Sequence, residues 1–143
     1  MMKIESIGKM FALGAMMGLV AVAPVRADDD ETPLSEQMEE TSAALKGLRK
    51  APDFAAKAEL ARKGQESTLN SLKYLPKMFA GMKDEKVKAK ATADYKRLVG
   101  QVYSLFAELE LAFLDEDDAK ADAVVDKLKD LKKEGHDAYI EDE

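Results

Sequence analysis

Residues 85–114 read EKVKAKATADYKRLVGQVYSLFAELELAFL, and this stretch decides the fold. Its apolar residues recur at alternating steps of four and three: Ala91, Tyr95, Leu98, Val102, Leu105, Leu109 and Ala112. Such steps return to one face of an α-helix, so the stretch predicts one long helix with a buried stripe. Val99, Phe106 and Phe113 widen the stripe, which would also suit a dimer interface. Gly100 lies off the stripe, where we expect it to permit a close helix contact.

Two further helical segments precede this stretch, at residues 33–50 and 53–74. Thr32 suits the N-cap of the first, with Pro33 in the first helical position. The first repeats its inward positions at Leu34, Met38, Thr41, Leu45 and Leu48, and the second at Phe54, Ala58, Ala61, Gln65, either Thr68 or Leu69, and Leu72. Many of the second set are small, which predicts space inside the fold.

A connecting segment and a last helix complete the pattern. Residues 76–82 follow the second helix and predict a loop, in which Met78 and Phe79 either cover an apolar site or seal the end of the core. Residues 115–118 are rich in N-cap residues and precede a helix at 118–140. Short connections make successive helices antiparallel, so the sequence predicts an all-α fold, an up-down-up-down four-helix bundle.

The N-terminal residues 1–27 have the pattern of a secretory signal peptide. Lys3 and Lys9 precede an apolar run at residues 10–23, and small residues up to Ala27 suit cleavage. The run is too short for a typical membrane span, although a retained anchor is the alternative. We therefore expect a periplasmic protein whose mature chain, residues 28–143, is one domain without membrane insertion.

Charge and cysteine content exclude several classes of protein. The chain has a net charge of −6, which becomes more negative once Lys3, Lys9 and Arg26 are removed, and the sequence shows no basic cluster. We expect no nucleic-acid binding. There is no cysteine, so disulfides, zinc–thiolate sites and iron–sulfur clusters are excluded.

The single histidine is the first candidate functional residue. His136 lies eight residues after Leu128, so it can share the inward stripe of the last helix. In the predicted bundle the end of this helix lies beside the start of the first, where Met38 occupies an inward position. Imidazole and thioether together are axial ligands of low-spin haem iron. A core-filling role for Met38 and a solvated role for His136 remain the alternatives, and Met78 is the second candidate for the thioether ligand.

Five segments of residues 28–143 resemble the cytochrome b562 family. PLSEQMEET at residues 33–41 is similar to its first helix, and DFAAK at 53–57 to the opening of its second. Pro76-Lys77 resembles its proline-bearing loop, and YKRLVGQ at 95–101 a segment of its third helix. The spacing from Leu128 to His136 matches that of its ligand histidine. Gly135 replaces a larger residue, and residues 132–136, KKEGH, lack the thiols with which cytochromes c′ attach haem.

The resemblance implies a site as well as a fold. It implies one non-covalent haem b with Met38 and His136 as metal ligands, lined further by Leu34, Pro76, Tyr95 and Lys132. Lys132 lies one turn before His136, where it can pair with a haem propionate.

The implied function is electron transfer. A haem with both axial positions filled leaves no position for substrate, and no nucleophile–base set is visible, so we do not expect an enzyme. The net charge suggests a redox partner with a basic docking surface, and the chain is expected to be a monomer or weak dimer. The alternative is a haem-free helical bundle with a structural, stress or binding role.

Overall fold

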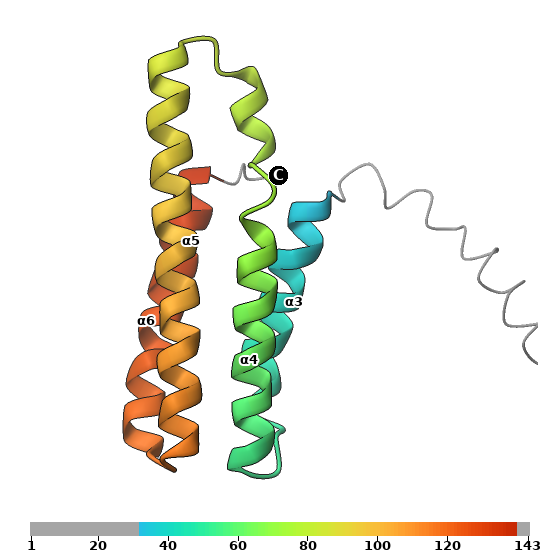
Figure 1. Cartoon of the computed structure of the whole chain (residues 1–143), viewed down its shortest axis with the longest axis vertical. Coiled ribbons are helices and arrows are strands. Elements are labelled where there is room, and N and C mark those ends of the chain that lie inside the picture. The colour runs from blue at the N-terminus through green and yellow to red at the C-terminus, as the bar shows by residue number, and fades with distance from the viewer. Residues whose placement is uncertain (1–31, 140–143) are drawn as a thin grey trace, which may run out of the picture. The chain divides into compact units, whose positions relative to one another are not determined.

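The computed structural model describes residues 32–139, which form four α-helices and one 3-10 helix and include no β-strand (Figure 1). The elements are α3 (Pro33–Gly47), α4 (Phe54–Ser71), η1 (Lys77–Gly81), which is the 3-10 helix, α5 (Glu85–Leu114) and α6 (Asp118–Tyr139). The described chain is all-helical, as predicted, and consistent with a helical bundle. The predicted signal peptide, residues 1–27, lies outside the described residues. Within those residues, no helix combines the length and apolar character needed to cross a membrane.

The ends of the helices follow from local hydrogen bonds. Asp53 caps α4, because its carboxylate accepts a hydrogen bond from the Ala56 N–H at 2.8 Å, and Asp84 accepts two such bonds at the start of α5. α3 and α4 end three residues earlier than predicted. The residues that follow each helix bond to carbonyls only three positions back, so both helices tighten into turns. The bounds of α5 match the prediction.

The buried face of α4 consists of small residues, namely Ala58, Ala61, Gly64, Ser67, Thr68 and Ser71. The hydroxyls of Ser67, Thr68 and Ser71 donate to carbonyls one turn back along α4, so they are buried with their hydrogen bonds satisfied. Leu69, one of the two predicted inward positions, is instead 52% exposed. The expectation for Gly100 is also wrong, because Gly100 is exposed and the close approach occurs at Gly64.

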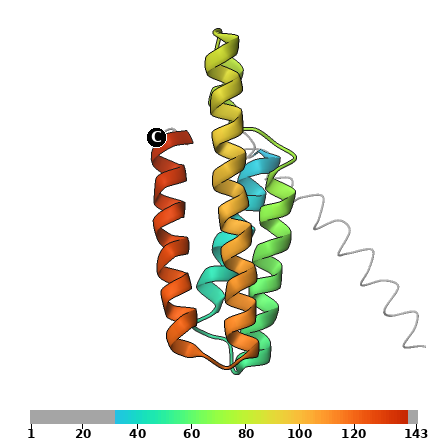
Figure 2. The same ribbon diagram turned by 60° about the vertical axis from the view of Figure 1, so that its left-hand side comes forward.

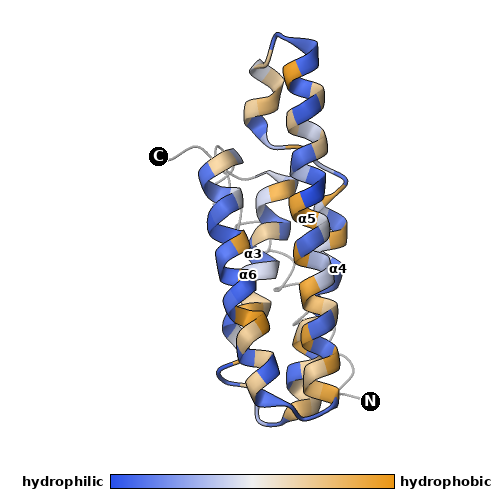
Figure 3. Cartoon of the chain, turned by 90° about the vertical axis from the view of Figure 1, so that its left-hand side faces the viewer, coloured by the Kyte–Doolittle hydropathy of each residue, from blue (hydrophilic) through white to orange (hydrophobic). Residues whose placement is uncertain are grey.

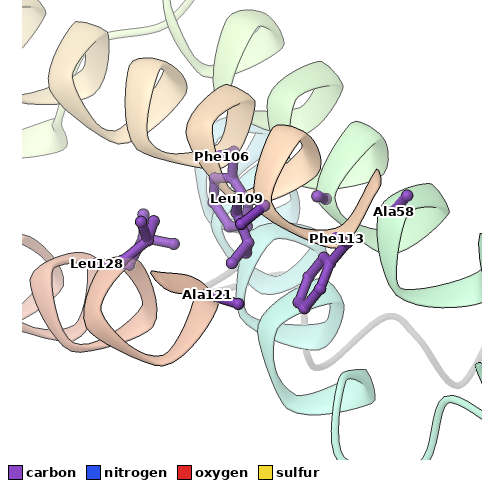
Figure 4. Close-up of a cluster of buried hydrophobic side chains, with 9 residues drawn as sticks. Ala58, Phe106, Leu109, Phe113, Ala121 and Leu128 are labelled. Carbon is purple, nitrogen blue, oxygen red and sulfur yellow. The ribbon is translucent and has the colours of Figure 1, made fainter. Parts of the chain in front are cut away.

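The main core is an apolar cluster shared by α4, α5 and α6. Figure 4 shows Phe106, Leu109 and Phe113 of α5 between Ala58 on one side and Ala121 and Leu128 on the other. Leu45 and Leu48, at the end of α3, pack against the same cluster. Figure 3 shows hydrophobic and hydrophilic positions interspersed along each helix. Most of the large apolar side chains point into the core, although Leu69, Leu111 and Leu114 are exposed. Burial of the inward-pointing side chains is the main stabilising contribution to the fold.

Three helix pairs pack closely: α3 with α4, α4 with α5, and α5 with α6. Figures 1 and 2 both show α5 running beside α4 and α6. An ion pair joins α4 to α5, in which Arg62 Nη1 lies 2.6 Å from Glu110 Oε2. α3 and α6 are not among the closely packed pairs. The two helices that carry Met38 and His136 are therefore separated on one side of the core.

Candidate functional site

An apolar cleft lies between α3 and α6, the two helices that do not pack closely on each other. Its lining residues come from α3, α4, α5 and α6, and most are apolar: Met38, Leu45, Leu98, Val99, Val102, Phe106, Leu128, Leu131 and Tyr139. The cavity volume of the cleft is about 120 Å³. That volume is below the roughly 300–1,000 Å³ of pockets that enclose a whole small molecule or cofactor, so a group of that size would extend from the cleft into solvent or widen it.

Met38 and His136 line this cleft together. Met38 lies on α3 and is half-buried, and His136 lies on α6 and is exposed. The prediction that both residues share one end of the core is supported by this placement, but His136 lies at the solvent edge of the cleft and not within the apolar stripe. In this part of α6, the inward positions are occupied by Leu131 and Gly135, which are half-buried.

The structure brings four of the six predicted site residues into the cleft. Tyr95 and Lys132 line it with Met38 and His136, whereas Leu34 and Pro76 do not. Leu34 is buried in a second apolar cluster with Phe79 and Tyr95. Pro76 is buried directly before η1. Leu34 therefore packs behind Tyr95, which lines the cleft.

Met78, the second candidate for the thioether ligand, lies outside the lining of the cleft. It packs instead against the cluster of Leu34, Phe79 and Tyr95. The predicted loop at residues 76–82 contains the 3-10 helix η1, and Phe79 is 1% exposed. Of the two roles expected for Met78 and Phe79, the structure therefore agrees with sealing this end of the core. This arrangement favours Met38 over Met78 as the thioether that faces His136.

An aromatic cluster that the sequence did not predict holds the end of α6. The rings of Phe79, Tyr95 and Tyr139 meet edge to face, with centroids 5.4–6.1 Å apart. The Tyr139 hydroxyl donates a short hydrogen bond to Asp94 of α5. Tyr139 lies three residues after His136, on the same side of the helix, and this spacing is the signal that could have identified it.

Polar contacts on both sides of His136 fix α6 to one segment of α5. Arg97 contacts Asp94 at 2.8 Å and Glu134 at 3.7 Å, and Tyr139 bonds to Asp94. The hydrogen bond from Tyr139, with Arg97 adding to it, lowers the pKa of Asp94. Burial, followed by the bond to Asp94, raises the pKa of Tyr139 to about 12. His136 is thus carried on a stretch of helix that is held before and after it.

Small polar groups line the α3–α4 side of the cleft. Thr41 and Ser67 share a hydrogen bond of 2.6 Å, and the Tyr95 hydroxyl donates to the Ser71 carbonyl at 3.3 Å. Burial raises the pKa of Tyr95 to about 12, so this phenol stays neutral at ordinary pH. Of the residues that line the cleft, Lys132 and His136 are exposed at its edge, so the inner walls consist of apolar and uncharged polar side chains.

No protein-family model matches this sequence, and no curated protein matches it. The resemblance to the cytochrome b562 family rests on the five segments quoted above. Within the described residues no three His, Cys, Asp or Glu side chains gather as a metal site. A haem iron needs only two ligands from the protein, so this finding does not bear on the Met38–His136 pair.

Proposed function

We propose that this chain is a periplasmic electron-transfer protein that resembles cytochrome b562 and holds one non-covalent haem b between Met38 and His136. The observation that carries the proposal is that these two side chains line one apolar cleft, from two helices that do not pack closely on each other. The thioether and the imidazole are ligand types that low-spin haem iron accepts. Export rests on the pattern of residues 1–27.

The proposal includes the antiparallel, up-down-up-down order of the four helices. Two clusters support this order. One joins the end of α3 at Leu45, the start of α4 at Ala58 and the start of α6 at Ala121. The other joins the start of α3 at Leu34 to the end of α6 at Tyr139. Successive helices that reverse direction bring these ends together.

The residues of the cleft fit a flat apolar group with carboxylate substituents. Its walls are apolar side chains, and Lys132 stands exposed at its edge, where its ammonium can pair with a propionate. A Cβ on Gly135, next to His136, would meet nothing within 4 Å beyond its own helical turn. There is therefore room beside the histidine, at the position where the resemblance is weakest.

When bound, haem b supplies a reversible one-electron couple at iron. Met38 and His136 are the residues that would hold the iron, and a thioether ligand would favour its reduced state. Tyr139, Asp94 and Arg97 orient the end of α6 that carries His136. The apolar walls exclude water from the cleft, which also favours the less charged state of the bound group.

The test is a visible spectrum of the purified protein with one equivalent of haemin, oxidised and then reduced. We expect a sharp Soret band and narrow, split reduced bands, since both axial positions are filled. Met38→Ala should give a five-coordinate, high-spin spectrum with a lower potential, and Met78→Ala should leave the spectrum unchanged. A broad band like that of free haemin would reject the proposal in favour of a haem-free bundle, and an unchanged spectrum of Met38→Ala would transfer the ligand role to another residue.

A further inference from the structure

A second depression, which we call the cationic groove, continues from the cleft along α3 and α6. It shares Ser42, Leu45, Lys132 and His136 with the cleft. Seven basic residues from three helical segments and a turn line it: Lys46, Arg49, Lys50, Lys57, Lys129, Lys132 and Lys133. Three acidic residues also line it, namely Asp118, Asp122 and Asp126. Basic residues therefore dominate this groove, although the whole chain has a net charge of −6.

Most of these basic side chains have no carboxylate partner within the described residues. Lys57 lies 3.9 Å from Asp118, and Lys133 lies 2.9 Å from Asp137. The other five, Lys46, Arg49, Lys50, Lys129 and Lys132, form no ion pair there. Like charges held close together repel one another, so this arrangement favours an anion that comes from outside the described fold.

The groove has an apolar floor and a basic rim. Phe113 and Ala121 are buried, and Leu45, Leu48 and Val125 are half-buried, whereas all the basic residues except Lys57 are exposed. The part of α6 that lines it, from Asp118 to His136, is about 27 Å long at 1.5 Å per residue. An extended peptide of about eight residues spans this length. A flat lipid surface would not reach the floor of such a groove.

We propose that the cationic groove is the docking site for an acidic, partly apolar segment of a partner protein. Carboxylates of that segment pair with Arg49, Lys50 and Lys129 along the rim, and its apolar side chains contact the floor. The groove ends at the exposed His136, so the partner docks beside the proposed haem ligand. That this docking serves electron transfer rests on the proposed function. The binding of an acidic segment in the groove does not depend on that function. At this face the partner is acidic, in contrast to the basic partner suggested by the net charge.

The test measures the fluorescence anisotropy of a labelled peptide of alternating glutamate and leucine, titrated with the purified protein. The triple variant Arg49→Glu, Lys50→Glu, Lys129→Glu should weaken binding at least about tenfold, and the Gln variant at the same positions should weaken it less. The matched control is Lys73→Glu, Lys83→Glu, Lys90→Glu, which makes the same change of charge at exposed positions outside the groove. Circular dichroism verifies that each variant is folded.

Two results would overturn the inference. Equal weakening by the groove variant and the control variant would mean that only the net charge matters. Absence of peptide binding, with groove-dependent binding of phosphatidylglycerol vesicles, would assign the groove to a lipid surface. The haemin spectrum is recorded on the same variants. If the protein binds haemin but shows no groove-dependent peptide binding, only the inference about the groove is rejected. If it shows groove-dependent peptide binding but does not bind haemin, only the proposed function is rejected.

Discussion

At the scale of single residues, Tyr139 links the chemistry of the site to the stability of the fold. Its ring closes the cluster with Phe79 and Tyr95, and its hydroxyl bonds to Asp94. Each contact joins the last turn of α6 to another element. His136 lies one turn earlier, so these contacts limit how far its imidazole can move relative to α5. Sequence reasoning proposed Met38 and His136 as a ligand pair but did not predict this support, because the partners of Tyr139 are far away in the chain.

The buried phenol of Tyr95 and the half-buried phenol of Tyr139 predict a loss of stability at alkaline pH. The pKa values of Tyr95 and Tyr139 are both raised from 10.0 to about 12, in each case first by burial. A raised pKa in the folded state stabilises the fold below pH 10, and this contribution is lost as the pH rises towards 12. We therefore expect the free energy of unfolding to fall in this range. Denaturant titrations at several pH values, with phenolate absorbance recorded in parallel, measure it.

Substitution of Tyr139 tests its part in this effect. Tyr139→Phe keeps the ring and removes the hydroxyl, so the alkaline loss should become smaller and the melting temperature at neutral pH should fall by a few degrees. The control is Tyr103→Phe, because Tyr103 is 37% exposed and makes no hydrogen bond through its hydroxyl in the described structure. An identical alkaline profile for Tyr139→Phe and the unsubstituted protein would contradict the assignment.

At the scale of elements, the small face of α4 determines how closely α5 can approach. A Cβ built on Gly64 would lie 2.3 Å from Phe106 Cε1 and 2.4 Å from Cδ1, and Phe106 is 1% exposed. A distance under 3.0 Å requires the ring or the backbone to move. The ring is enclosed by the main core cluster and has little freedom to shift. Gly64 is therefore required by packing and not by backbone conformation.

Gly64→Ala should consequently destabilise the protein although alanine favours helix. Overpacking of a core costs about 1–3 kcal/mol, against a gain of up to about 1 kcal/mol in helix propensity. We expect the free energy of unfolding in urea to fall by about 1–2 kcal/mol. The matched control is Gly100→Ala on α5, where a Cβ would meet nothing within 4 Å, and this variant should gain about 0.5–1 kcal/mol. If both variants gained stability, the packing argument would be wrong.

The comparison between α4 and α5 shows what the sequence alone could predict. α5 has large apolar residues at a regular spacing, so its limits and its buried face were predicted correctly. The second half of α4 buries Gly64, Ser67 and Ser71, which hydrophobic periodicity does not detect. The pattern placed Met38 and His136 at one end of the core, but it did not reveal that α3 and α6 are separated. That feature depends on which helices pack closely, and therefore on the whole fold.

At the scale of the whole described chain, the main departure from close packing is the separation of α3 from α6. α3 contacts the rest of the helices chiefly through α4, and α6 chiefly through α5. The apolar cleft and the cationic groove both lie along this side. No basic cluster is visible in the sequence, although the folded chain forms the basic rim of the groove. Its residues are separated along the chain and interspersed with acidic ones, and only the fold brings them together.

This arrangement predicts where a ligand will stabilise the protein. A group that binds the cleft contacts α3 and α6 at once, so it should strengthen the association of these two helices, which do not pack closely on each other. A ligand that binds only the folded state at a concentration of 100 times its Kd contributes about 2.7 kcal/mol, so haemin should raise the melting temperature by several degrees.

Amide hydrogen exchange should slow most in α3 and in the last turns of α6, and least in the buried centre of α5, which is already protected. His136→Ala should abolish both effects, whereas Met78→Ala should retain them. Equal melting curves with and without haemin, or slowing spread evenly over all four helices, would show that nothing binds between α3 and α6.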